Sequence, residues 1–419
     1  MEYHLLKYLD TPDVRKIDVY ESIGGYTGLK NALTMKSDEI LSQMKKSGLR
    51  GRGGAGFPTA IKWTTTATDP ATPKYVICNA DEGEPGTFKD KVLLELNPHQ
   101  IIEGMIIAAH TVGAKLGYVY LRGEYPGAFV SMQAALDEAR SRGYLGPDAL
   151  GAGLKFNLHL HKGAGAYICG EESALIESLE GKRGQPRVKP PRTANKGFMR
   201  KPTTSNNAET FANVPLIMSM GADAYASIGT KESPGPKLFS VSGHVEKPGV
   251  YEAPMGISLH DLIYDLCGGI KGGRKLKGVI PGGVSTPILT QDKIDCPMDF
   301  VSVSECGSML GSGAVIVFDE TTCMVRVAMR IARFFEHESC GKCTPCREGC
   351  GWLRAILERI ENGNGHMRDL DLLLEVADNI EGRSFCALGD GASMSARSFV
   401  YSYRSEFEAH IKEQRCAFK

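Results

Sequence analysis

Three cysteines near the C-terminal end of the chain constrain its fold more than any other feature. Cys340, Cys343 and Cys346 follow one another at intervals of three residues. This spacing gathers three thiolates around one small centre and is typical of an iron–sulfur cluster. A [4Fe–4S] cluster needs four thiolates. We expect Cys386 to supply the fourth, because the helical sequence between can fold it back toward the other three.

The alternatives to a cluster at these cysteines are a zinc ion or unliganded thiols. Structural zinc sites more often use two separated Cys-x-x-Cys pairs, so the triplet favours the cluster. Cys350 lies four residues after Cys346. We expect the next helical turn to carry it away from the cluster, and we interpret it as a packing residue.

Composition excludes several classes of protein. Lys plus Arg and Asp plus Glu both number 49 in the 419 residues, so the net charge is zero, which argues against a nucleic-acid partner. No apolar run is long enough to span a membrane, and the N-terminus lacks the pattern of a signal peptide. Twelve cysteines in such a chain indicate reduced thiols and metal ligands. We therefore expect a cytoplasmic protein without direct membrane insertion.

Strand and helix patterns alternate along the first half of the chain. Helices are expected at 37–46, 98–112, 128–141 and 172–179, and strands at 75–78, 118–121 and 156–160. Strands that alternate with helices indicate an α/β fold with a largely parallel sheet. Residues 180–207 lack periodicity and predict a long loop, which a helix over 207–220 follows.

The pattern changes after a predicted linker at 230–236. Strands at 237–243, 249–253, 276–280 and 314–318, with a helix capped by Ser258, indicate a small α+β module. From Cys323 onward the sequence is nearly all helical. We therefore predict three domains: 1–230, with an N-terminal extension over 1–47, then 231–322 and 323–419.

A glycine-dense loop at 48–58 contains the pattern G-x-G-x-x-G at Gly51, Gly53 and Gly56. A polar amphipathic segment precedes it and Pro58 follows, so it is not the strand–loop–helix fingerprint of a Rossmann fold. A loop without side chains still lets backbone N–H groups approach a phosphate or a flat ring. Nearby positive charge comes from Arg50, Arg52 and Lys62. The alternative is a flexible turn.

Polar patches at 78–86, 163–172 and 203–210 complete the set of candidate segments. The first follows a strand, where ligands of open α/β sheets collect. The second and third precede helices, whose N-termini attract anions. Each also has a simpler interpretation: a solvated acidic turn for the first, acids that stabilise a helix dipole for the second, and N-capping for the third.

Taken together, these segments resemble one family. The chain is similar to the NADH-binding flavoprotein subunit of respiratory complex I and to the diaphorase subunits of NAD-linked hydrogenases and formate dehydrogenases. The match covers nearly the whole chain and is carried by residues 48–58, 79–86, 163–172 and 206–210 and by the cysteine pattern.

The resemblance implies an α/β fold with a Rossmann-like domain for FMN and NADH, a β-grasp (ubiquitin-like) module and a helical bundle that holds one [4Fe–4S] cluster. It implies hydride transfer from NADH to FMN, then one-electron transfer to the cluster and onward to partner subunits and quinone, in an NADH:quinone oxidoreductase of the translocase type. The expected partners are a thioredoxin-like [2Fe–2S] subunit and a large iron–sulfur subunit, which would place the chain peripherally on the inner membrane. No side chain need act as a general base, so no catalytic residue is expected.

The resemblance also implies site residues, matched motif by motif. FMN contacts fall on Gly51, Gly53, Lys62, Asn79, Asp81, Glu82, Gly170, Asn206, Asn207 and Thr210. NADH contacts fall on Phe57, Glu84, Glu171, Glu172 and Lys189, and Gly54 belongs to the same cofactor-binding loop. Leu388 is expected near the flavin on the cluster side, and the cluster ligands are Cys340, Cys343, Cys346 and Cys386.

The acidic residues Glu82, Glu84, Glu171 and Glu172 would repel a phosphorylated ribose, so they favour NADH over NADPH. Two positions depart from the family pattern. Members carry Phe where this chain has Arg192, and some carry a second Phe where it has Thr65. Those rings help to clamp the adenine, and an Arg guanidinium can also stack on a base.

Three competing hypotheses remain. The first is an iron–sulfur scaffold whose glycine loops bind nothing, and the second is an Rnf-type electron-transfer subunit, which would carry paired ferredoxin runs that are not found here. The third is the diaphorase of a hydrogenase or formate dehydrogenase. Such subunits often carry extra cluster domains for which this chain has no room, so the pattern favours complex I.

Overall fold

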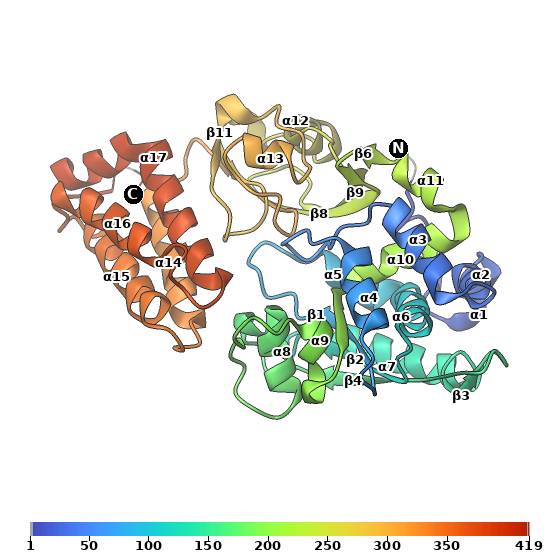
Figure 1. Ribbon diagram of the computed structural model, residues 1–419. Helices are drawn as coiled ribbons and strands as arrows, with labels where there is room; N and C mark the ends of the chain where they lie inside the picture. The colour runs from blue at the N-terminus through green and yellow to red at the C-terminus, as the bar shows by residue number, and fades with distance from the viewer. Residues whose placement is uncertain (1–2, 417, 419) are drawn as a thin grey trace. The chain divides into compact units, whose positions relative to one another are not determined.

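The structure is a computed structural model that describes residues 3–416 and 418 (Figure 1). Its internal contacts divide the chain into two units. The first comprises Met1–Gly83, Thr87–Phe239 and Glu252–Gly256, and the second comprises Glu84–Gly86, Ser240–Tyr251 and Ile257–Lys419. The predicted boundaries at 230 and 322 stay predictions.

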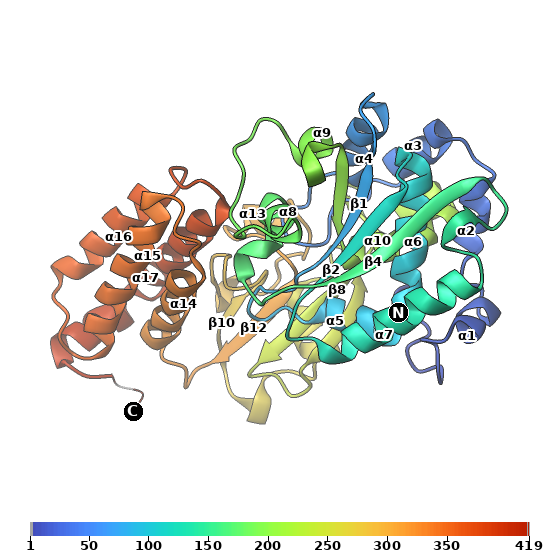
Figure 2. The same cartoon turned by 90° about the horizontal axis from the view of Figure 1, so that it is seen from below.

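The first unit is built on a mainly parallel sheet with the strand order β3-β4-β2-β1-β5 (Figure 2). Its strands are β1 (Tyr75–Ala80), β2 (Leu116–Leu121), β3 (Gly146–Ala149), β4 (Leu154–Lys162) and β5 (Thr203–Asn207). Strand β1 pairs in parallel with both β2 and β5, and only the β3–β4 pair is antiparallel in the described part of this sheet. The predicted α/β class is therefore confirmed.

Helices cover this sheet because their apolar residues face it. The buried helix α6 (Pro98–Val112) contacts β1, β2 and β4, and α10 (Ala208–Met220) contacts β1 and β5. Helix α7 (Pro126–Ser141) contacts β4. Other helices of this unit are α5 (Lys89–Leu96), α8 (Glu172–Leu179), α9 (Thr193–Lys196), α11 (Ala222–Ala226) and the 3-10 turns Tyr167–Gly170 and Phe198–Arg200.

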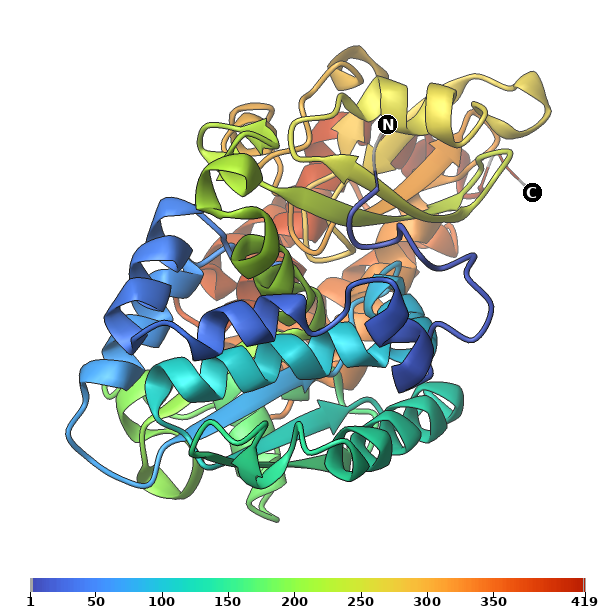
Figure 3. The same cartoon turned by 90° about the vertical axis from the view of Figure 1, so that its right-hand side faces the viewer.

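The N-terminal helices α1 (Ile17–Ser22) and α2 (Thr27–Leu33) have no clear periodic signal in the sequence, and α2 packs beside α6 (Figure 3). A buried carboxylate of α6 holds both helices. Glu103 of α6 accepts hydrogen bonds from the Tyr20 hydroxyl at 2.6 Å and from the backbone N–H groups of Tyr26 and Leu29, each at 2.9 Å. A buried carboxylate needs such donors, so Glu103 ties this segment to α6.

The glycine loop connects two helices, α3 (Ser37–Lys46) and α4 (Thr59–Thr68). No strand precedes it directly, in agreement with the rejection of a Rossmann fingerprint. The long loop predicted at 180–207 is wrong in part, because it contains the short helix α9 and a 3-10 turn, and its end forms β5 beside β1. Strand β5 reads Thr-Thr-Ser-Asn-Asn and lacks the apolar signal of a buried strand. Its burial is satisfied by hydrogen bonds instead, such as Thr204 Oγ1 to Thr66 Oγ1 at 2.9 Å.

A second sheet has the strand order β11-β10-β12-β8-β9. Its strands are β8 (Pro236–Gly243), β9 (Gly249–Pro254), β10 (Leu276–Ile280), β11 (Leu289–Thr290) and β12 (Ala314–Asp319). Strand β12 pairs in parallel with β8 and antiparallel with β10. The predicted Ser258 cap is present, since its hydroxyl accepts from Asp261 N at 2.9 Å. The short elements around this sheet are α12 (Leu259–Asp261), the π-helix Leu262–Leu266, the 3-10 turns Lys271–Gly273 and Gln291–Lys293, and α13 (Ser302–Glu305). The predicted linker before the sheet contains the hairpin of β6 (Gly229–Thr230) and β7 (Ser233–Pro234).

The C-terminal part is a helical bundle, as predicted (Figure 1). It consists of α14 (Met324–Glu338), α15 (Thr344–Glu361), α16 (Arg368–Ile380) and α17 (Ala387–Glu413). Helix α14 buries Met324, Ala328, Ile331 and Phe335, one apolar stripe, against α15 and α17. Among the described residues, no helix combines the length and the apolar character that a membrane span requires.

Candidate functional site

The glycine loop is anchored from within by Arg52. Its backbone N–H donates to Thr210 Oγ1 at 2.8 Å, and its fully buried guanidinium donates to the Pro234 carbonyl at 2.7 Å. Arg52 therefore packs inside the loop, and the contribution of its charge to ligand binding stays a prediction. Arg50 likewise donates to Gly56 O at 2.8 Å, within the loop itself. These arginines shape the loop, because each satisfies carbonyl groups that would otherwise lack a donor.

The loop carries glycine where a side chain would not fit. A Cβ atom at Gly53 would lie 2.9 Å from Cβ of Asn207, so only glycine allows this approach. Gly54 has a φ of +144°, and a Cβ built there would meet no atom within 4 Å. The backbone at Gly54 thus borders open space, which suits a loop that receives a flat ring or a phosphate.

Predicted flavin contacts meet at the carboxyl ends of two neighbouring strands. Asn79 near the end of β1 is in register with Asn207 at the end of β5. Asn79 Nδ2 donates to the Gly170 carbonyl at 2.9 Å, and Trp63 Nε1 donates to Asn206 Oδ1 at 2.8 Å. The structure therefore brings together residues that are far apart in the sequence, at the sheet edge where α/β proteins bind ligands.

Glu82 lies beside this edge, but its carboxylate already has partners. It accepts from the backbone N–H groups of Asp90 at 2.8 Å and Lys91 at 3.0 Å, at the start of α5, and from the Tyr125 hydroxyl at 3.0 Å. Burial, together with the neighbouring Asp90 carboxylate, raises the pKa of Glu82 to about 7. Next to it, the Asp81 carbonyl accepts from Gly83 N at 2.9 Å. Glu82 therefore positions this turn.

The acidic pair at the start of α8 is balanced by two lysines. Glu171 accepts from Ala174 N at 2.9 Å as the N-cap and from Lys189 Nζ at 2.7 Å. Glu172 lies 3.0 Å from Lys62 Nζ, which also donates to Ser205 O at 2.8 Å. Burial alone would raise the pKa of Glu172, but the Lys62 charge and hydrogen bond outweigh it and lower that pKa. These ion pairs weaken the repulsion of a phosphorylated ribose that the sequence predicts.

Two predicted contacts belong to the second unit. Glu84 accepts from the Ser285 backbone N–H at 2.8 Å. Leu388 lies in the first turn of α17 and is buried. Glu84 is therefore held by a hydrogen bond and Leu388 by packing, each within the second unit.

The predicted cluster ligands gather at helix N-termini. Cys343 is the N-cap of α15, Cys346 lies in its first turn, and Cys386 is the N-cap of α17. The backbone N–H of Phe385 donates to Cys343 Sγ at 3.3 Å, so the Cys386 segment reaches the triplet as expected. Helix N-termini stabilise thiolates. Thiols so placed suit the donor set of an iron–sulfur cluster, with Cys340 in the loop just before.

Cys350 is closer to this group than the sequence suggested. Its Sγ lies 3.9 Å from Cys346 Sγ, because residues four apart share one helix face. The Cys346 and Cys350 thiols lie within hydrogen-bond distance, and this contact lowers the pKa of Cys346 to about 7 and raises the pKa of Cys350. The expectation that the next helical turn carries Cys350 away from the predicted cluster ligands is therefore wrong.

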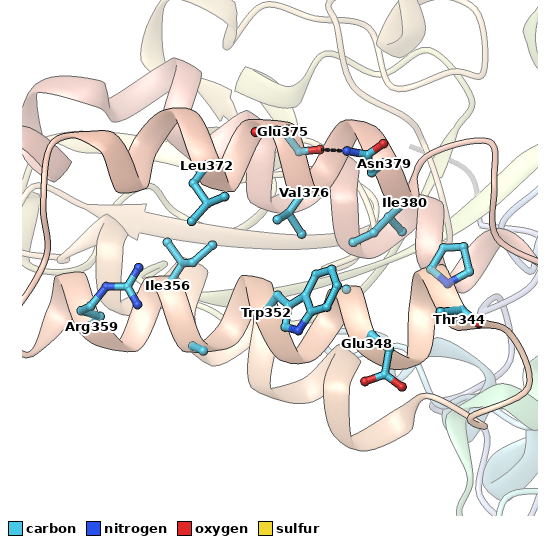
Figure 4. A pocket seen from close by; sticks show the side chains of 13 residues that line it. Thr344, Glu348, Trp352, Ile356, Arg359, Leu372, Glu375, Val376, Asn379 and Ile380 are labelled. Carbon is cyan, nitrogen blue, oxygen red and sulfur yellow. Dashed lines mark hydrogen bonds between the residues drawn. The ribbon is translucent and has the colours of Figure 1, made fainter.

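A groove of about 560 Å³ runs between α15 and α16 (Figure 4). Trp352, Leu372, Val376 and Ile380 line it, and Trp352 is 59% exposed. Its lining comes from these two helices and, among the described residues, includes none of the predicted FMN or NADH contacts. The groove is therefore a surface feature of the bundle that begins beside Thr344, next to Cys343.

Comparison with known proteins agrees with this arrangement. Residues 44–216 match the family model of the Nuo51 FMN-binding domain, 237–317 match the SLBB domain, and 326–410 match the NADH-ubiquinone oxidoreductase-F iron-sulfur binding region. The predicted fold class and the predicted FMN and iron–sulfur cofactors are thereby confirmed. The individual contacts stay predictions.

Full-length relatives share the same organisation. The chain is 53% identical over 415 residues to the NADH-quinone oxidoreductase F subunit 2 of Rhizobium meliloti, covering 99% of both chains. It is 50% identical over 414 residues to the NADH-quinone oxidoreductase F subunit of Streptomyces coelicolor, covering 99% of this chain and 92% of that one. A crystal structure of an NAD+-reducing [NiFe]-hydrogenase in the H2-reduced state matches with a TM-score of 0.86 and 38% identity, covering 98% of this chain and 67% of that one.

The fold and the two sites define a flavin-binding and iron–sulfur-binding protein of the NADH dehydrogenase class. The chain belongs to the family of NADH-quinone oxidoreductase F subunits.

Proposed function

We propose that this chain is the NADH-oxidising subunit of an NADH-quinone oxidoreductase. It takes electrons from NADH through FMN and passes them one at a time to a [4Fe–4S] cluster. The observation that carries this proposal is the meeting of Gly53, Asn79, Asn206 and Asn207 at the carboxyl ends of β1 and β5, inside the region that matches an FMN-binding domain.

The residues at that edge would hold FMN by complementary chemistry. FMN, when bound, accepts a hydride and releases electrons singly, which is what an NADH donor and an iron–sulfur acceptor require. The amides of Asn79, Asn206 and Asn207 can donate to and accept from a flavin edge. Gly53 and Gly54 let the loop backbone approach it. Lys62, held by Ser205 O and Glu172, supplies positive charge nearby.

NADH would be recognised by a second group of residues in the same unit. Phe57 is 40% exposed and offers a flat face, and Lys189 and Glu171 form an ion pair at the start of α8. The exposed loop residue Arg192 lies beside Phe57. These groups bind and orient the nucleotide, and no general base is needed.

The thiols at the N-termini of α15 and α17 would bind the cluster that receives the electrons. We further propose that electrons leave through a thioredoxin-like [2Fe–2S] subunit and a large iron–sulfur subunit of the same complex. Those partners would hold the chain peripherally at the cytoplasmic side of the inner membrane, where the complex acts as a translocase.

A second candidate function is that of a diaphorase in a hydrogenase, which the likeness to the NAD+-reducing [NiFe]-hydrogenase favours. Identification of the subunits that copurify separates the two. A quinone-reducing complex supports the first function, and a nickel–iron subunit supports the second.

The flavin site is tested by a glycine substitution. Gly53→Val would push a branched side chain into Asn207, so we expect bound FMN and NADH:ferricyanide activity to be lost while iron content stays normal. Gly143→Asn is the matched control, because Gly143 has a φ of +76° that Asn tolerates and no atom lies within 4 Å of the position that a Cβ would take there. Full FMN content in Gly53→Val, or a purified wild-type protein without flavin, would contradict the proposal.

A further inference from the structure

A second group of potential metal ligands lies in the helical bundle, built from residues that the predicted cluster does not use. Cys323 is the N-cap of α14, Glu361 ends α15, His410 lies in the last turn of α17, and Cys416 follows that helix. All of them are buried. One ligand atom from each residue lies within 4.8 Å of the others.

The distances among Cys323, Glu361 and His410 match those around a single tetrahedral ion, and Cys416 Sγ lies within 4.8 Å of all three ligand atoms. Cys323 Sγ lies 3.3 Å from His410 Nε2 and 3.6 Å from Glu361 Oε2. His410 Nε2 and Glu361 Oε2 are also 3.6 Å apart. Around a zinc ion, ligands at about 2.0–2.3 Å are separated from one another by roughly 3.3–3.8 Å.

Hydrogen bonds with neighbouring residues orient the ligand atoms of His410 and Glu361 toward Cys323. His410 Nδ1 lies 2.8 Å from the Glu406 carbonyl. A carbonyl can only accept, so Nδ1 carries the proton and the Nε2 lone pair faces Cys323. Glu361 Oε1 accepts from Arg326 Nε at 2.8 Å, which leaves Oε2 directed at the group. Such support for the ligands is characteristic of metal sites.

Arg326 also places a positive charge beside the two cysteines of this group. Its backbone N–H donates to Cys323 Sγ at 3.3 Å, and its Nη2 lies 3.6 Å from Cys416 Sγ. Two thiolates and one carboxylate would carry three negative charges. A divalent ion together with the Arg326 guanidinium balances them.

We propose that Cys323, Glu361, His410 and Cys416 bind one zinc ion, separate from the iron–sulfur cluster. The mixed sulfur, nitrogen and oxygen donors suit zinc, while magnesium and calcium prefer oxygen alone. All protein ligand positions are filled, so the ion has a structural role. It ties the segment after α17 to the start of α14 and the end of α15.

The test is the metal content of the purified full-length protein with its cluster in place. We expect about one zinc per chain in addition to the cluster iron. His410→Ala and Cys416→Ser should lose that zinc, keep their iron and flavin, and unfold at a lower temperature. Cys267→Ser is the matched control, because Cys267 is a buried cysteine of the same unit outside the group. It should keep the zinc.

Cobalt provides an independent readout. Iron-loaded protein that has been stripped of zinc and given Co²⁺ should develop the thiolate-to-cobalt absorption of a tetrahedral site, and Cys416→Ser should weaken it. Three results would overturn the proposal. These are iron-loaded wild type without zinc or cobalt uptake, zinc that disappears in Cys340→Ser but persists in Cys416→Ser, and a native disulfide between Cys323 and Cys416.

Discussion

The guanidinium of Arg192 lies over the ring of Phe57, with its Cζ atom 6.0 Å from the ring centroid. Phe57 is the next-to-last residue of the glycine loop, and Arg192 is the exposed N-cap of α9. A cation over an aromatic face is attractive, and guanidinium and phenyl groups are both flat. The pair therefore places an exposed guanidinium against Phe57, a predicted NADH contact.

We expect Arg192→Ala to weaken NADH binding. Loss of a planar cationic contact costs about 1–2 kcal/mol, which raises KM for NADH roughly five- to thirtyfold where KM follows affinity. Arg192→Phe should restore most of the affinity, because a ring supplies the same flat face. Steady-state ferricyanide reduction measures both variants, and bound flavin should stay normal.

The coupling of this pair is measured by adding Phe57→Ala. If the two groups act as one surface, the double variant should lose less than the sum of the single losses. Arg200→Ala serves as control, because Arg200 is another exposed arginine just after α9. An unchanged KM in Arg192→Ala would show that Arg192 is a solvated loop residue.

A further prediction concerns the cysteines around the cluster. Cys340→Ser, Cys343→Ser, Cys346→Ser and Cys386→Ser should each disrupt the cluster, since each removes one thiolate ligand. Cys350→Ala should keep its iron. It should also lower the reduction potential of the cluster, because a thiol that can donate to Cys346 is lost and such donors stabilise the reduced state. Iron analysis and EPR of the reduced protein, followed by redox titration, give both quantities. Equal loss of iron in Cys350→Ala would show that the ligand set is wrong.

The sequence predicted the elements that carry their own signals. Helix α3 spans the predicted 37–46 and α6 spans 98–112, because their apolar positions recur at helical spacing. Strand β5 was missed because its Thr, Ser and Asn side chains resemble a loop, and only its partner β1 and the Thr66 hydroxyl make burial favourable. Local pattern cannot reveal a strand that tertiary hydrogen bonds stabilise.

The same limit applies to the sites. The cysteine triplet is visible because its ligands are close in sequence. The group of Cys323, Glu361, His410 and Cys416 spans most of the bundle, and helix packing alone brings it together. The sequence also predicted acids without their partners, whereas the structure pairs Glu171 with Lys189 and Glu172 with Lys62.

Because Glu171 and Glu172 are paired with lysines, Glu84 gives the clearer test of the predicted preference for NADH over NADPH. Glu84→Gln removes a negative charge and adds an amide donor, so we expect kcat/KM for NADPH to rise relative to NADH. Ferricyanide reduction with both donors measures the ratio. The control is Asp137→Asn, which neutralises an exposed acid on α7 that has no predicted nucleotide contact. A ratio that does not change in Glu84→Gln would remove Glu84 from the nucleotide site.

The last prediction concerns a buried lysine of the first unit. Lys237 is fully buried, with its Nζ 3.6 Å from Glu209 Oε2, an oxygen that Lys89 Nζ already contacts at 2.8 Å. Burial lowers the pKa of Lys237 to about 7, and the attraction of Glu209 does not offset it. Because the folded pKa lies below that of an unfolded lysine, the unfolded state binds the extra proton between pH 7 and about 10. The free energy of unfolding that Lys237 contributes therefore falls as the pH falls across this window, by at most about 1.4 kcal/mol per pH unit.

Lys237→Met removes this titration while Lys89 still neutralises Glu209. The difference in Tm between the variant and wild type should therefore increase as the pH is lowered from 10 to 7, and then stay constant below 7. Thermal unfolding across this range, followed by intrinsic fluorescence, measures the difference. Lys231→Met, at an exposed position nearby in the sequence, should show a difference that does not depend on pH. If Lys237→Met gives the same flat profile, Lys237 keeps its proton throughout this range, and the carboxylates around it outweigh the cost of its burial.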